Sequence, residues 1–111
     1  MGLAEQKHGA VTVLKPDGPL LGPDAEAFRS RLLEVLAGSL GRCVVDASAI
    51  PFVDSQGLEA LADASDEMAR SGHALKLCGV TETVRQVFEL TQLTPRFEYF
   101  EDVHAAVRSF L

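Results

Sequence analysis

Short apolar runs alternate along the chain with longer segments in which apolar residues recur every three or four positions. The runs at residues 10–15, 43–45, 74–80 and 96–100 are rich in β-branched and other apolar residues, which predicts strands. The run 43–45 is continuously apolar, which is typical of an interior strand covered on both faces. Residues 96–100 alternate between polar and apolar, which indicates a half-buried strand near a sheet edge.

The segments with helical spacing predict four helices. Pro23 suits the first turn of the first helix, and Gly38 and Gly41 end that helix. Ser55 begins the second helix, and Thr81 can cap the third. Each helix is apolar on one side only, so the helices should pack on a sheet. The predicted inward-facing residues of the second helix are Leu58, Leu61, Ala62, Ser65, Met68 and Ala69. Those of the last helix are Val103, Ala106, Val107 and Phe110.

The order of these elements predicts a small mixed sheet. Residues 16–19 have turn chemistry, so a short strand through Leu20 should lie antiparallel to the strand 10–15. A helix separates each later strand from the next, and such pairs are parallel. We therefore expect an α/β fold, a single domain over residues 1–111, with about five strands packed with about four helices.

Composition and charge limit the classes of partner. The chain has 111 residues, a formal net charge of −6 and a pI of about 4.9. An acidic chain without basic clusters repels phosphate groups, so we expect neither nucleic acid nor a membrane surface as partner. No apolar run approaches the roughly 20 residues that cross a bilayer. Residues 1–8 contain no apolar core of a secretory signal, so a cytoplasmic location is expected.

The cysteines and histidines give no sign of a metal or redox centre. Cys43 and Cys78 lie in predicted strands, where free cysteine usually acts as a small core residue. His8, His73 and His104 are scattered and lack metal-ligand spacing, so they should be surface residues. We expect no metal and no cofactor.

An enzymatic role is also unexpected. A serine hydrolase would need a G-x-S-x-G turn, but the sequence around Ser55 is V-D-S-Q-G. The acidic run Asp63, Asp66 and Glu67 fits a solvated helix face better than a carboxylate site. Without a convergent acid, base and nucleophile, hydrolysis is the weakest of the alternatives.

The start of the second helix presents Asp54, Ser55 and Gln56 after a buried strand and a loop. Asp54 or Ser55 can cap the helix, and the first-turn N–H groups together with the helix dipole favour an anion there. Gly57 costs the helix stability, which is consistent with close approach of a partner's backbone. A phosphate added to Ser55 could therefore be held by backbone donors, although most residues in such positions are only caps.

The longer pattern D-x-S-x-[apolar]-x-F-[apolar]-D-S-x-G-L, from Asp46 to Leu58, resembles the signature of STAS domains, the family of anti-sigma-factor antagonists. The similarity in element order extends over nearly the whole chain. The stretch 75–80 and the helix after it also resemble the fourth strand and third helix of the family.

The resemblance implies partner switching. In that family a serine kinase, which is also the anti-sigma factor, phosphorylates the serine after the aspartate, and a metal-dependent phosphatase reverses this. The unphosphorylated form binds its partner and the phosphorylated form releases it. Transferred to this chain, Ser55 is the acceptor, and the partner-binding residues are Asp54, Ser55, Gln56 and Gly57, with Leu21, Gly22 and Asp24 in the loop 20–24 as weaker candidates.

The chain departs from many antagonists at Gln56, where a small hydroxyl residue is common. A larger amide could alter kinase recognition or the partner interface. An alternative is therefore a constitutive STAS subunit of a lipid or anion transport system or of a stressosome-like assembly, without a phosphorylation switch. The sequence leaves the oligomeric state open, a homodimer included.

Overall fold

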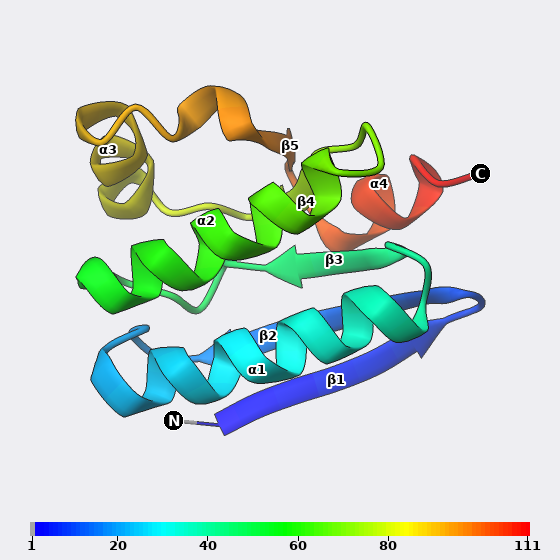
Figure 1. Ribbon diagram of the computed structural model, residues 1–111, viewed down its shortest axis with the longest axis horizontal. Helices are drawn as coiled ribbons and strands as arrows, with labels where there is room; N and C mark the ends of the chain where they lie inside the picture. The colour runs from blue at the N-terminus through cyan, green and yellow to red at the C-terminus, as the bar shows by residue number, and fades with distance from the viewer. Residues whose placement is uncertain (1) are drawn as a thin grey trace.

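The computed structural model describes residues 2–111 as one five-stranded sheet with helices on both faces (Figure 1). The strands lie in chain order across the sheet; the first pair is antiparallel and every later pair is parallel. This confirms the predicted fold class. The elements are β1 (Gly2–His8), β2 (Val11–Asp17), α1 (Gly22–Gly38), β3 (Cys43–Asp46), α2 (Ser55–Ala69), β4 (Leu75–Cys78), α3 (Glu82–Leu90), the 3₁₀ turn η1 (Thr94–Arg96), β5 (Phe97–Phe100) and α4 (Val103–Arg108).

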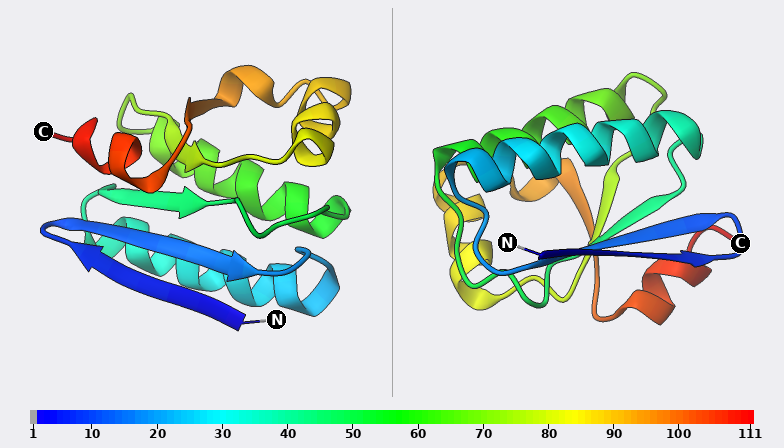
Figure 2. Two further views of the ribbon diagram at one scale, coloured as in Figure 1. Left: turned by 180° about the vertical axis from the view of Figure 1, so that it is seen from behind. Right: turned by 90° about the horizontal axis from the view of Figure 1, so that it is seen from below.

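The sheet separates two hydrophobic clusters of different size. α1, α2 and α3 contribute to the larger cluster, whereas α4 covers the opposite face (Figure 2). Along β3, Cys43 and Val45 belong to the larger cluster and Val44 to the smaller one, and all three are fully buried. Successive side chains of a strand lie on opposite faces. β3 is therefore covered on both sides, as its continuous apolar run predicts.

The antiparallel pair is present, and the predicted strand 10–15 is one of its members, β2, but the sequence predicts the other strand and the turn wrongly. Its first strand is β1, Gly2–His8, a segment without a strand pattern. β2 continues through Pro16 and Asp17, so the tight turn lies after His8 and not at residues 16–19. Leu20 forms only an isolated parallel bridge with Val53. The sequence of β1 shows no strand pattern because nearly all of its side chains are exposed. Polar and apolar residues alternate along a strand only when one of its faces is buried.

The helices begin where their capping residues predict. The hydroxyl of Thr81 accepts a hydrogen bond from the Val84 N–H, and α1 has its proline in the first turn. The inward face of α2 differs in detail: Ala60 and Ala64 are buried, whereas Ala69 is exposed. This shift follows from packing, because α2 is covered by α1 on one side and by the sheet below it.

Cys43 and Cys78 are free and buried, as predicted. Burial raises the pKa of each thiol to about 12. Because the thiolate is the reactive form, neither cysteine should react with Ellman's reagent in the folded protein at neutral pH, and both should react after unfolding in guanidinium chloride. Rapid labelling of the native protein would contradict the burial of β3 and β4.

Candidate functional site

Asp54 holds together the starts of two helices. As the N-cap of α2, it accepts a hydrogen bond from the Gly57 N–H at 2.9 Å on one carboxylate oxygen. Its other carboxylate oxygen accepts from the N–H of Gly22, the first residue of α1, also at 2.9 Å. Gly22 has a φ of 47°, a left-handed conformation that glycine adopts easily. The cap predicted from sequence therefore also joins α2 to α1.

The loops before α1 and α2 run side by side through backbone hydrogen bonds. The Leu20 N–H donates to the Phe52 carbonyl at 3.2 Å, and the Asp54 N–H donates to the Leu20 carbonyl at 3.1 Å. The structure thus places the segment 21–24 next to the segment 54–57. The sequence separates these segments by about thirty positions, and only the fold brings them together.

Gly57 is buried between the two loops. A Cβ built on Gly57 would lie 2.5 Å from the Leu20 carbonyl oxygen and 3.0 Å from the Cβ atoms of Leu20 and Val53. The backbone that approaches Gly57 closely therefore belongs to the chain itself, not to a partner as the sequence suggests. Any contribution of Gly57 to partner binding is indirect, through the position of the two loops.

Ser55 lies at the first position of α2 with its side chain exposed, and Gln56 and Asp24 are also exposed. Leu21, Gly22 and Asp54 are half-buried at the junction of the loops. Sequence reasoning missed one member of this region: Phe52 is 47% exposed, an unusual position for a large aromatic side chain. The sequence could have indicated Phe52, because it lies only two residues before the capping residue Asp54.

Two backbone donors hold the pKa of Asp54 below its ordinary value, with the Gly57 N–H the larger influence and the Gly22 N–H the next. A carboxylate that accepts backbone hydrogen bonds is favoured in its ionised form. Asp54 therefore stays negative at neutral pH, directly beside the Ser55 hydroxyl.

We expect Asp54→Ala to lower the melting temperature at neutral pH. Because the pKa is lower in the folded chain, the carboxylate stabilises the fold above its ordinary pKa, and this contribution disappears as the pH falls through the lowered value. The difference between Asp54→Ala and the native protein should therefore shrink in acid, with Asp54→Asn in between because it keeps one oxygen acceptor. Thermal unfolding followed by circular dichroism across this pH range measures the effect, and equal melting temperatures at neutral pH would contradict it.

The acidic run Asp63, Asp66 and Glu67 on α2 is partly exposed, as predicted, and each of the three also pairs with an arginine. These pairs tie α2 to α1, to η1 and to its own last turn. They join Asp63 to Arg29 at 2.6 Å, Asp66 to Arg96 at 2.7 Å and Glu67 to Arg70 at 2.9 Å.

The histidines and the acidic and sulfur-containing side chains of the described residues add no catalytic or metal-binding group to the region around Ser55. All three histidines are exposed, as predicted, and none is hydrogen-bonded to Ser55 within residues 2–111. In the same range, no cluster of His, Cys, Asp and Glu side chains is suited to a metal ion. The described helices include none with the length and apolar character needed to cross a membrane.

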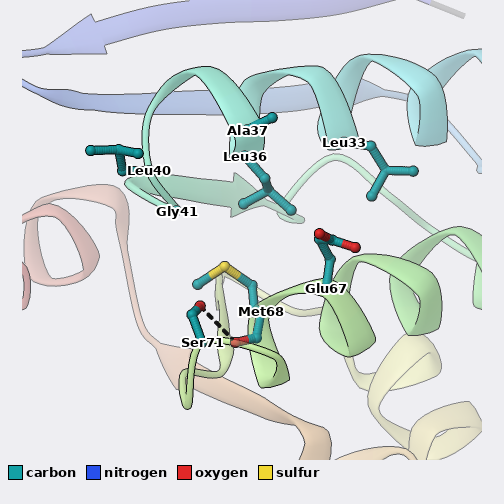
Figure 3. A pocket seen from close by; sticks show the side chains of 8 residues that line it. All are labelled: Leu33, Leu36, Ala37, Leu40, Gly41, Glu67, Met68 and Ser71. Atoms are coloured by element: carbon teal, nitrogen blue, oxygen red, sulfur yellow. Dashed lines mark hydrogen bonds between the residues drawn. The ribbon is translucent and has the colours of Figure 1, made fainter.

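A surface groove lies away from Ser55, between the C-terminal halves of α1 and α2. It has a volume of about 610 Å³ and is lined mainly by apolar side chains, among them Leu33, Leu36 and Met68, with the exposed Leu40 at its rim (Figure 3). The region around Ser55 is not part of it. A smaller hollow, of about 350 Å³, adjoins the start of α2 and is lined by polar and charged side chains: Glu26, Arg29, Gln56, Glu59 and Asp63.

Several solved structures have the same fold. A putative anti-sigma factor antagonist from Thermotoga maritima is similar at a TM-score of 0.86 and 19% identity, over 96% of this chain and 92% of that one. The anti-sigma factor antagonist SpoIIAA in its unphosphorylated form is similar at 0.77 and 18%, over 98% and 96%. The murine Slc26a9 anion transporter is similar at 0.74 and 22%, over 94% of this chain but 18% of the transporter. At these identities the likeness shows a shared fold.

Sequence comparison identifies the family. No curated protein sequence matches the chain. The family model of the STAS domain matches residues 3–106, which is nearly the whole chain, and the observed sheet order and the D-S-x-G helix start agree with this match. The chain therefore belongs to the STAS domain family.

Proposed function

We propose that this chain is a partner-switching protein of the anti-sigma-factor-antagonist type. In its unphosphorylated form it binds an anti-sigma serine kinase; phosphorylation of Ser55 by that kinase releases it, and a phosphatase restores binding. The observation that supports this best is the exposed Ser55 hydroxyl at the first position of α2 in a STAS domain.

The proposed contact area, here called the switch surface, consists of the exposed and half-buried residues of the two adjoining loops. Asp54 fixes its shape through the hydrogen bonds to Gly22 and Gly57, so both loops are positioned before a partner arrives. Preorganised loops lose less conformational entropy on binding. The switch surface comprises Leu21, Gly22, Asp24, Asp54, Ser55 and Gln56, with Gly57 beneath it and Phe52 as an apolar addition.

Phosphorylation would act on this surface through charge. A phosphate brings about −1.5 to −2 charges at neutral pH. Asp54 is adjacent and, with its lowered pKa, cannot relieve the repulsion by taking up a proton. Glu59 is exposed one turn further along α2, in a chain that already has a net charge of −6. A partner surface matched to a neutral hydroxyl would therefore meet repulsion and would bury an unpaired charge.

The first experiment identifies the partner and tests the modification together. The Ser55→Ala variant, which cannot be phosphorylated at this position, serves as bait in a pull-down from the native host, and mass spectrometry identifies the bound protein. The purified partner is then incubated with ATP and either native chain or Ser55→Ala. We expect the native chain alone to gain one phosphate, and an equal gain in Ser55→Ala would contradict the assignment of Ser55.

The alternative is a constitutive STAS subunit of a transport or stressosome-like assembly. The likeness in fold to a domain-sized part of the Slc26a9 anion transporter favours this second reading. In that case the switch surface would be a permanent docking surface. The captured partner would then lack kinase activity, and ATP would not release it from the native chain.

A further inference from the structure

The outer edge of β1 has no neighbouring strand within the described residues 2–111. β1 is the first strand of the sheet, and Figure 1 shows it along one border of the molecule, with no other described strand or helix beyond it. It runs for seven residues without a proline or a break in its pairing with β2. The strand at the other border, β5, has only four residues. A long, regular and exposed strand edge is a template for pairing with another strand.

The pairing of β2 determines which backbone groups of β1 point outward. The Thr12 N–H donates to the Arg42 carbonyl on the β3 side of β2. Backbone groups alternate along a strand, so Val13 and Lys15 bond toward β1, where their partners are Gln6 and Ala4. The alternate residues Leu3, Glu5 and Lys7 therefore turn their backbone N–H and carbonyl groups to the open edge.

Two of the residues whose backbone groups face the open edge carry opposite charges, and their side chains lie on the same face of β1. Glu5 and Lys7 both line the shallow groove between β1 and α1, beside Arg31. Arg31 binds both carboxylate oxygens of Glu5, at 2.8 and 2.7 Å, which fixes the position of this acid. Lys7 makes no salt bridge with another described residue; the pKa of the neighbouring Glu5 is lowered chiefly by Arg31 and to a smaller extent by Lys7.

From this arrangement we infer that two copies of the chain associate through their β1 strands, antiparallel across a two-fold axis at Gln6. In this register Glu5 of each copy faces Lys7 of the second copy, and each such pair exchanges both backbone hydrogen bonds. A register centred on Glu5 would instead place two glutamates opposite each other. Like charges directly opposite destabilise a strand pair, whereas opposite charges stabilise it. The charge pattern of β1 is thus complementary to itself in one register, and the two sheets would join into one.

Charge exchange tests the register directly. Glu5→Lys gives a chain with lysine at both positions, and Lys7→Glu gives one with glutamate at both. Each variant alone should self-associate about tenfold more weakly than the native chain, because both cross-strand pairs become repulsive. An equimolar mixture of the two variants should recover association, because each lysine then faces a glutamate. Sedimentation velocity over a concentration series measures this, with Arg31→Ala as a control for the lost intramolecular pair in Glu5→Lys.

A backbone block tests the strand edge itself. Lys7 does not use its N–H to bond β2, so Lys7→Pro removes only an outward donor and is tolerated on an edge strand. This variant should keep the native circular dichroism spectrum and lose self-association, whereas Lys7→Ala should lose it only in part. A native chain that stays monomeric at hundreds of micromolar would overturn the proposal. So would a mixture of the charge variants that associates no better than either variant alone.

Discussion

A negative charge at position 55 should weaken binding of the captured partner by more than a hundredfold. In the proposed complex the neutral Ser55 hydroxyl is buried under the partner, beside the ionised Asp54. Phosphorylation, or Ser55→Asp as its mimic, would add an unpaired charge there, and a loss of about 3 kcal/mol corresponds to more than a hundredfold in affinity. Ser55→Ala removes only a hydroxyl and should bind like the native chain. Isothermal titration calorimetry measures the affinity of the purified partner for the native chain, the phosphorylated chain and the two variants.

The controls separate loss of binding from loss of folding. Aspartate in the first turn of a helix interacts favourably with the helix dipole, so Ser55→Asp should not lower the melting temperature. Ser30→Asp adds the same charge at an exposed position on α1 and should leave affinity nearly unchanged. Equal affinity of Ser55→Asp and Ser55→Ala would show that charge at this position does not control binding.

Gly57→Ala should lower the free energy of unfolding by about 1–3 kcal/mol, the usual cost of forcing an extra carbon into a packed interior. The new methyl group would lie 2.5 Å from the Leu20 carbonyl oxygen, closer than any stable contact allows. This oxygen belongs to backbone that is bonded to the Asp54 N–H, so it cannot move without disturbing the cap of α2. Denaturant unfolding at neutral pH measures the change.

Gly38→Ala is the matched control. Gly38 ends α1, and a Cβ at this position would meet no atom within 4 Å. Alanine is a better helix former than glycine, so this variant should equal or slightly exceed the native stability. If Gly57→Ala were equally harmless, the close approach of the loops at Leu20 would not limit the choice of residue at this position.

The switch surface and the fold depend on the same few contacts. Asp54 caps α2, bonds to α1 and places a carboxylate beside Ser55. Gly57 allows the Leu20 loop to pass close to the start of α2. Partner binding and stability should therefore respond together to substitutions at Asp54 or Gly57, and separately to substitutions at Ser55.

The sequence by itself determined the central part of this protein. The continuous apolar run 43–45 indicated a strand buried on both faces, and helical spacing after Ser55 and Thr81 located α2 and α3, because burial on a known face forces a regular pattern on the residues. The start of α2 was equally clear, because a cap is a local interaction between Asp54 and a residue three positions later.

Tertiary structure decided the features that depend on residues far apart in the chain. β1 has almost no buried side chain, so hydrophobic patterning could not reveal it, and only backbone pairing with β2 places it. The second bond of Asp54, to Gly22, and the approach of Leu20 to Gly57 join loops about thirty positions apart. The type of a residue reflects how buried and how polar its surroundings are. It does not reveal which distant segment of the chain forms those surroundings.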